Sequence, residues 1–399
     1  MNSSLQSKLN NPWRVLPLFE AVEICDSLRK PVSSTEREKR IVNKSKAELF
    51  PYYGATGQIG FIDAYLTDGE YVLLGEDGAP FLDPFASKAY VIDGKTWVNN
   101  HAHILRSKTN NRFLCYYLNS VNYKGYVSGS TRLKLTQAGM KKIPVPVPPL
   151  SEQERIVGIL DAASEKIDTI QRNAERNLAN AKEIFQQVLN EEMTPKPGWK
   201  KARIGDVCSK IGAGATPKGG KNSYCKDGIS LIRSQNVLYN KFSYKDLAHI
   251  NDNQAKLLDG VTIFANDILF NITGASIARC CVVPSNVIPA RVNQHVMILR
   301  LSTLLVLHRF LVYYLIASSS QRKLLTIGEE GSTRQALTKT DLAEFEFLFP
   351  NREQQEQIVN KIDLISQKCD SVINNCTRII AQCSELKQQI LAKAFNGEL

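Results

Sequence analysis

The sequence predicts an α+β fold in which two globular domains of mixed α and β structure are separated by two long helices, arranged as an internal pseudo-twofold repeat. Two observations predict this fold. The eight letters GSTRLKLT at 129–136 recur as GSTRQALT at 331–338. Each copy lies between a domain-sized segment with short β-type runs and a proline-free stretch of about 45 residues with helical periodicity.

The repeat extends well beyond these eight letters. When the chain is aligned with itself at an offset of 202, 22 of the 61 positions from 129 to 189 are identical. Upstream, VNNHAHILR at 98–106 matches VNQHVMILR at 292–300. Each half is therefore a domain followed by a helix. The expected boundaries are 1–150 and 194–352 for the domains, and 151–193 and 353–399 for the helices.

Each globular domain is expected to be mixed α and β. Runs such as YVLLG, KAYVI, ILFNI, CCVV and VMILR lie among glycine turns, which is typical of short strands. One helix-like stretch, FLCYYL or FLVYYL, follows each VN(N/Q)H segment. These patterns do not predict the strand order.

The two proline-free stretches carry apolar residues at alternating steps of three and four, which predicts two helices about 60 Å long that pair as a coiled coil. SEQE at 151–154 matches a capping box, and Asn351 offers a cap for the second helix. The expected pairing residues are Ile156, Leu160, Ile167, Ile170, Leu178 and Phe185 in the first helix, and Ile358, Ile362, Cys369, Val372, Ile380 and Ile390 in the second.

Composition indicates a soluble, multi-domain, intracellular protein, which we expect in the cytoplasm. The chain has 399 residues, 43% of them hydrophobic, with no apolar run near 18 residues and no apolar leader. Its nine cysteines show no CxxC spacing, which fits reduced thiols better than a disulfide framework. No membrane association is expected.

The positive charge is concentrated in the two domains. Residues 1–150 carry 19 basic and 13 acidic side chains, and residues 194–352 carry 21 and 11. Basic surfaces attract phosphate through counterion release, which suggests nucleic acid as a partner. Charge alone would also fit a basic protein with no such partner.

The candidates for chemistry favour structural roles. Cys369, Cys376 and Cys383 are seven residues apart, about 10 Å along one helical stripe, so they are expected to pack in the seam rather than share a metal. His101 and His103 could be a ligand pair, but the second copy keeps only His295, so hydrogen-bonded structural histidines are the better interpretation.

No catalytic motif is present. The glycine pairs of GEDGAP at 75–80 and NITGAS at 271–276 match no dinucleotide or P-loop pattern, and tight turns that approach a partner are the better interpretation. LDPF at 82–85 resembles an adenine methyltransferase motif but lacks its second proline. We expect a binding protein with no catalytic residue, no metal and no cofactor.

GSTRxxLT, PVPPLSEQERIV at 146–157 and the heptad helix that follows, in this order and largely repeated, resemble the specificity subunit of type I restriction-modification enzymes. PYYGATGQIGFID at 51–63 is similar to a target-recognition segment of that family. The resemblance implies two target-recognition domains, each reading half of a bipartite double-stranded DNA target, held apart by an antiparallel coiled coil. It implies a non-catalytic subunit that carries two methyltransferase subunits and, in the full complex, two ATP-dependent restriction subunits.

Base readers are expected where the two domains differ, because each would read a different half-site. Arg and Gln can contact base edges, whereas Ser, Thr and Lys mostly contact phosphates. The candidates, each of which could also be an ordinary loop residue, are the loop Tyr52, Tyr53, Gly54, Ala55, Thr56 and Gly57 with Glu76 and Asp77, and in the second domain Thr216, Pro217, Lys218, Arg233, Ser234, Gln235, Asn236 and Thr273.

The repeated Gly-Ser-Thr-Arg has a different expected role, since a base reader could not stay constant while its target changed. Either its arginine contacts phosphate, or the segment fixes each domain against its helix. The residues concerned are Ser130, Thr131 and Arg132, and Ser332, Thr333 and Arg334.

Two other classes of function stay open. One is a non-catalytic coiled-coil assembly protein whose basic charge is incidental, and the other is an enzyme with an unfamiliar site. Recruitment of a methyltransferase that modifies one split sequence would distinguish the expected function from both.

Overall fold

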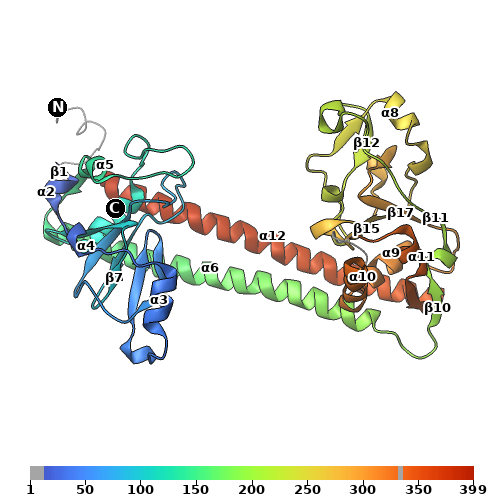
Figure 1. Ribbon diagram of the computed structural model, residues 1–399, viewed down its shortest axis with the longest axis horizontal. Helices are drawn as coiled ribbons and strands as arrows, with labels where there is room; N and C mark the ends of the chain where they lie inside the picture. The colour runs from blue at the N-terminus through green and yellow to red at the C-terminus, as the bar shows by residue number, and fades with distance from the viewer. Residues whose placement is uncertain (1–12, 331–335) are drawn as a thin grey trace. The chain divides into compact units, whose positions relative to one another are not determined.

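The computed structural model describes residues 13–330 and 336–399, which form two compact units (Figure 1). Unit 1 comprises the chain up to Arg176 together with Cys376–Leu399, and unit 2 comprises Asn177–Asn375. The long helices α6 (Leu150–Met193) and α12 (Arg352–Asn396) each contribute to both units. Among the described residues, none of the helices has the length and apolarity needed to cross a membrane.

The globular part of unit 1 contains three sheets with the strand orders β1-β9, β2-β8-β5-β6 and β4-β3-β7. In the last of these, β3 runs parallel to β7 and antiparallel to β4. The elements are β1 (Arg14–Pro17), α2 (Leu18–Ala21), β2 (Val22–Ile24), α3 (Ser34–Ile41), β3 (Phe50–Gly54), β4 (Gly57–Ile62), β5 (Tyr71–Gly75), β6 (Ala89–Ile92), β7 (Trp97–Val98), β8 (Ala102–Ser107), α4 (Asn111–Ser120), α5 (Gln137–Lys141) and β9 (Pro144–Val147), with short 3-10 turns at Asp26–Leu28 and Lys46–Glu48.

The globular part of unit 2 repeats this topology. Its sheets have the orders β10-β18, β11-β17-β14-β15 and β13-β12-β16, and β12 again runs parallel to one neighbour and antiparallel to the other. The elements are β10 (Lys200–Arg203), α7 (Ile204–Val207), β11 (Cys208–Ala213), β12 (Ile229–Ile232), β13 (Ala248–Ile250), α8 (Asp252–Lys256), β14 (Ile268–Asn271), β15 (Cys280–Val282), β16 (Ala290–Val292), β17 (Val296–Leu301), α9 (His308–Ile316), α10 (Ser318–Glu330), α11 (Lys339–Glu344) and β18 (Glu346–Phe349), with 3-10 turns at Gly220–Ser223, Ser234–Asn236, Asp259–Val261, Gly274–Ser276 and Ser285–Val287.

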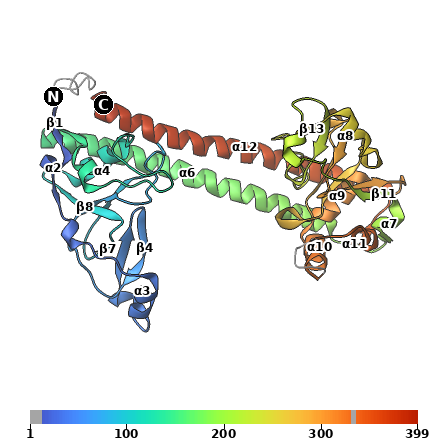
Figure 2. The same ribbon diagram turned by 45° about the horizontal axis from the view of Figure 1, so that its top comes forward.

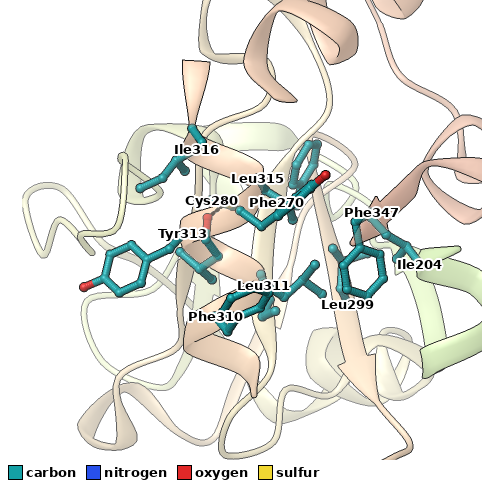
Figure 3. Close-up of a cluster of buried hydrophobic side chains, with 14 of the residues drawn as sticks. Ile204, Phe270, Cys280, Leu299, Phe310, Leu311, Tyr313, Leu315, Ile316 and Phe347 are labelled. Carbon is teal, nitrogen blue, oxygen red and sulfur yellow. Dashed lines mark hydrogen bonds between the residues drawn. The ribbon is translucent and has the colours of Figure 1, made fainter. Parts of the chain in front are cut away.

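The helix that follows each VN(N/Q)H segment packs on the four-stranded sheet and forms the core. In unit 2, Phe310 and Leu311 of α9 belong to one buried cluster with Phe270 of β14 and Leu299 of β17 (Figure 3). In unit 1, the corresponding cluster joins α4 to β5 and β8. Burial of these large apolar side chains is the main stabilising contribution to each domain.

The two long helices pair antiparallel. In unit 1, Leu160 near the start of α6 belongs to one buried cluster with Phe395 near the end of α12. In unit 2, Met193 at the end of α6 belongs to one buried cluster with Ile362 near the start of α12. Figures 1 and 2 show α6 and α12 side by side within each unit. The expected fold class, two mixed α and β domains with an antiparallel helix pair, is confirmed.

The seam is narrower than the predicted stripe. Ile170 is 50% exposed and Val372 is 42% exposed, so their assignment to the seam is wrong. Among the described residues, α6 and α12 are the two helices that meet along this seam. The side chains that face the partner helix directly are therefore buried, and every second apolar position of the stripe lies at the edge of the contact and keeps exposed surface. The buried positions are Ile156, Leu160, Ile167, Ala174 and Ala181 in α6 and Ile358, Ile362, Cys369, Cys376 and Cys383 in α12, and Leu178, Phe185, Ile380 and Ile390 are partly buried.

Of the two caps expected at the starts of the long helices, one is wrong and one is confirmed. Ser151 lies inside α6, which begins at Leu150, so its assignment as a cap is wrong. Asn351 is confirmed as a cap, because its Oδ1 accepts a hydrogen bond from the Gln354 N–H at 2.9 Å.

A buried glutamine joins each helix to its domain. Gln355 is fully buried; its Nε2 donates to the carbonyls of Leu305 at 2.8 Å and Pro350 at 2.9 Å, and its Oε1 accepts from the Leu307 N–H at 2.8 Å. Gln153 is also fully buried, donating to the Pro148 carbonyl at 2.9 Å and accepting from Thr109 at 2.9 Å. The repeated glutamine therefore satisfies the backbone where helix and domain meet.

An arginine and a tyrosine from the core helix hold a second point on each long helix. Arg112 and Tyr116 of α4 both contact Oδ1 of Asp161, at 2.6 and 2.7 Å. In unit 2, Arg309 lies 2.6 Å from Oδ1 of Asp363, which also accepts a hydrogen bond from Tyr313. The repeated aspartates thus fix each domain on its helix.

Candidate DNA interface

The two groups of candidate base readers lie at equivalent places in the two domains. Tyr53 pairs with Val98 in the parallel β3-β7 ladder, and Ile232 pairs with Val292 in the parallel β12-β16 ladder. Residues 54–57 and 233–236 therefore both lie at the end of the middle strand of the three-stranded sheet. Two dissimilar stretches of sequence thus occupy one position in the repeated fold.

The glycine turn of the first domain lies beside this segment. Gly75 ends β5, and a Cβ added there would lie 2.5 Å from the Ala79 Cβ and 3.0 Å from the Ala55 carbonyl oxygen, so a side chain does not fit. In the second domain Asn271 takes this place, and its Nδ2 donates to the Ser234 carbonyl at 2.9 Å. The interpretation of these segments as tight turns is supported.

A third turn, Asn-x-His, holds the other two together. The Asn99 N–H donates to the Tyr53 carbonyl at 3.0 Å, and its Oδ1 accepts from the His101 N–H at 2.8 Å. Asn293 makes the same two bonds, to the Ile232 carbonyl and from the His295 N–H, both at 3.0 Å. These asparagines fix the turn from which the next strand starts.

The His101 and His295 carbonyls complete the connection. Each accepts a backbone hydrogen bond from the glycine turn, from Glu76 at 2.8 Å in the first domain and from Ile272 at 3.1 Å in the second. Three turns therefore converge in each domain on the same backbone bonds, while most of their side chains differ. This cluster of turns is the candidate DNA interface.

Four of the candidate readers, Tyr52, Gly54, Glu76 and Asn236, are buried inside this frame, so the expectation that they read bases is wrong. Tyr52 is 1% exposed, and its hydroxyl bonds to the backbone of Val32. Asn236 is fully buried, and its Nδ2 donates to the carbonyls of Ser243 at 2.9 Å and Lys245 at 3.2 Å. Tyr52 belongs to a strand rather than a loop, which puts its side chain in the core.

Glu76 is 8% exposed. It accepts a hydrogen bond from Arg29, and Lys134 lies 3.2 Å from its Oε1. Burial opposes ionisation, but the hydrogen bond from Arg29 and the nearby charges lower the pKa of Glu76 below its usual value. The carboxylate is thus committed to a buried network.

His103 extends this network. It is fully buried, with Nδ1 2.8 Å from Asp26 and Nε2 2.9 Å from the Leu135 carbonyl. Burial raises the pKa of Asp26, but the hydrogen bond and charge of His103 outweigh it, so the pKa is lowered. A structural, hydrogen-bonded role for this histidine is supported. The parts of Asp26 and Arg29 in this network could not be predicted from the repeat, because the second copy has no matching charged residues.

The other candidates retain surface. Thr56, Lys218 and Gln235 are exposed. Arg233 is partly exposed, with its guanidinium over the Tyr224 ring at 5.4 Å and bonded to the Asp246 carbonyl. The partly buried candidates are Tyr53, Ala55, Gly57, Asp77, Thr216, Pro217, Ser234 and Thr273.

In the first domain the Gly-Ser-Thr-Arg segment lies against the glycine turn. Arg132 Nε is 2.6 Å from Asp77 Oδ1, and the Leu135 N–H donates to the Glu76 carbonyl at 2.7 Å. A Cβ at Gly129, where φ is 101°, would lie 2.3 Å from the Arg132 carbonyl oxygen, so glycine is required. Ser130 and Thr131 are exposed. These contacts attach the segment to the glycine turn of its own domain, and its role in fixing that domain against the helix stays a prediction.

The second copy of this segment lies mostly outside the described residues, including Ser332, Thr333 and Arg334. Just after it, the Leu337 N–H donates to the Ile272 carbonyl at 2.8 Å, which repeats the bond between Leu135 and Glu76.

Comparison with known proteins identifies this class of duplicated fold. Residues 11–177 and 196–378 match the family described as the type I restriction modification DNA specificity domain. A putative type I restriction enzyme specificity subunit of Haemophilus influenzae is 41% identical over 152 residues, 38% of this chain and 36% of that protein. The EcoKI specificity subunit of Escherichia coli K12 is 22% identical over 72% of this chain and 65% of its own length, and the EcoBI subunit of E. coli is 24% identical over 90% and 79%.

Solved structures share the fold. A chain from work on the complex assembly and conformational transition of a type I restriction-modification system has a TM-score of 0.69 and 19% identity, covering 98% of this chain and 99% of that one. The HsdS subunit of Thermoanaerobacter tengcongensis has a TM-score of 0.50 and 18% identity, covering 98% of each chain.

The chain belongs to the type I restriction-modification DNA specificity family, and the resemblance seen in the sequence is confirmed. This is a family of specificity subunits, which agrees with the expectation that this chain is not the catalytic one. The chain spans less than two thirds of the length of the Haemophilus and EcoKI relatives.

Proposed function

We propose that each globular domain recognises one half of a bipartite double-stranded DNA target. The observation that carries this proposal is the cluster of three turns, which has the same backbone frame in both domains but different side chains. A common frame with variable side chains is what two readers of different half-sites require. The excess basic charge of the two domain segments supplies the attraction to phosphate.

We also propose that the antiparallel helices dock two methyltransferase subunits, and two restriction subunits in the full complex, in the cytoplasm. The equal helices repeat the same contacts with their domains, through Gln153 and Asp161 and through Gln355 and Asp363. Such internal repetition suits two identical partners on one chain. The methyl donor and ATP would belong to those partners.

Co-expression of the chain with methyltransferase subunits of the type I class, in a host without other adenine methylation, tests this function. Sequencing that detects methylated adenines is expected to give one split sequence with a fixed spacer. Methylation of an undivided sequence, or by the isolated chain, would contradict the proposal.

A further inference from the structure

The middle residue of the Asn-x-His turn is exposed in both domains. It is Asn100 in the first domain and Gln294 in the second. The residues on either side of it are held by the backbone bonds of the frame described above, whereas its own side chain is exposed. It is also the one position of this turn at which the two domains differ.

In the second domain this side chain contacts the candidate reader Thr216 directly and is connected to Thr273 through His295. Gln294 Oε1 accepts a hydrogen bond from Thr216, and its Nε2 lies 3.2 Å from His295 Nε2. His295 Nδ1 lies 2.8 Å from the Thr273 hydroxyl. Thr216, Gln294, His295 and Thr273 thus form one chain of polar side chains across the interface.

This chain orients the amide without using up its hydrogen bonds. A carboxamide oxygen has two lone pairs and its nitrogen has two hydrogens, so Gln294 keeps one acceptor and one donor free. In the first domain the Asn100 side chain makes no hydrogen bond within residues 13–330 and 336–399, so its amide is also free to bond to a partner.

We propose that Asn100 and Gln294 are specificity-determining residues that each contact an adenine base edge in the half-site of their own domain. Asn and Gln amides can donate to adenine N7 and accept from its N6 amino group in a two-point contact. The Gln294 amide, held by Thr216 and His295, needs little further ordering on binding. This inference rests on the proposed function.

The test uses the full complex, with Asn100→Ala and Gln294→Ala in separate chains. Asn253→Ala in α8 is the matched control, since it removes an exposed amide elsewhere on unit 2. The methylated sequence of the parent is mapped first. Binding is then measured to duplexes in which each A·T pair of that target is replaced in turn.

Each alanine variant is expected to lose about 5- to 150-fold of discrimination at one A·T pair, in one half-site only. Unchanged discrimination at every A·T pair would overturn the inference, as would weaker binding that is uniform over all duplexes. Because both side chains are exposed, the variants are expected to keep the parent melting temperature. Gln294→Asn provides a second, milder variant with the same half-site readout. A parent complex that reads no bipartite target would overturn the proposed function and this inference together.

Discussion

Replacing Gln355 by leucine is predicted to lower the free energy of unfolding of unit 2 by about 2–4 kcal/mol. Gln355 is fully buried where α12 meets its domain, and leucine has a similar size but no polar atoms. The change leaves the Leu307 N–H without its acceptor and the Leu305 and Pro350 carbonyls without a donor.

The magnitude follows from these three lost hydrogen bonds. An unsatisfied buried N–H costs about 1–3 kcal/mol. Carbonyl oxygens tolerate a missing partner better, and the added apolar burial offsets part of the cost, so the total stays well below three full penalties.

Urea unfolding followed by tryptophan fluorescence measures the change. In unit 2, Trp199 packs edge-on against Phe310 with 5.8 Å between the ring centroids. The chain has three tryptophans, so a parent chain in which Trp13 and Trp97 are replaced by phenylalanine reports on unit 2 alone. Gln357→Leu is the control, because it makes the same substitution at an exposed position of α12. The reasoning is refuted if both variants lose the same stability or if Gln355→Leu costs less than about 1 kcal/mol.

Three further predictions concern the frame and the interface. Acid is expected to destabilise unit 1 before unit 2. Folding lowers the pKa of Asp26 and of Glu76, so their ionised forms stabilise unit 1 at pH values above their unfolded pKa of about 4. This stabilisation is lost as the pH falls further and the two carboxylates become protonated. Trp97 and Trp199 fluorescence follow the two units, and a single common transition would contradict this order. Arg132→Ala is expected to leave the salt dependence of DNA binding nearly unchanged, because Asp77 already pairs with this arginine. Lys218 is exposed, so Lys218→Ala should weaken binding to all sequences and reduce the slope of log K against log salt concentration by about 0.9. Equal slopes for the two variants would count against that distinction. Gly129→Ala should destabilise unit 1 by at least about 1–3 kcal/mol in urea unfolding, and parental stability would show that the turn can adjust.

The sequence predicted the architecture because the architecture is repeated. An offset that aligns GSTR with GSTR also aligns the helix stripes, so the fold class and the helix pair could be inferred without coordinates. The seam was predicted too wide, since periodicity gives the apolar face but not how many neighbours cover it. Ile170 and Val372 lie on that face and remain half-exposed.

The roles of single polar residues depended on contacts that periodicity does not contain. Gln153 sits in a motif that resembles a capping box, yet its partners Thr109 and Pro148 show that it joins helix and domain. Asn236 was predicted to be a reader because it lies in a segment in which the two domains differ. Its burial comes from bonds to Ser243 and Lys245, which local sequence does not reveal.

The equivalence of the two candidate segments could not be inferred from the sequence. Residues 54–57 and 233–236 have little sequence in common, but both lie at the end of the middle strand of a three-stranded sheet. Asn100 and Gln294 were missed because they lie inside a segment that matches between the copies, whereas base readers were expected where the two domains differ. Their exposure in that segment is visible only in three dimensions.

Replacing the candidate readers of one domain tests the central claim most directly, that a constant frame carries two separate readers. In the full complex, residues 216–218 and 233–236 of the second domain are replaced by those of a relative with a different methylation target, and the two Asn-x-His turns and the two long helices are left intact. Mapping methylated adenines is expected to show a change in one half of the split sequence, with the other half and the spacer preserved. A change in both halves, or in the spacer, would contradict the account.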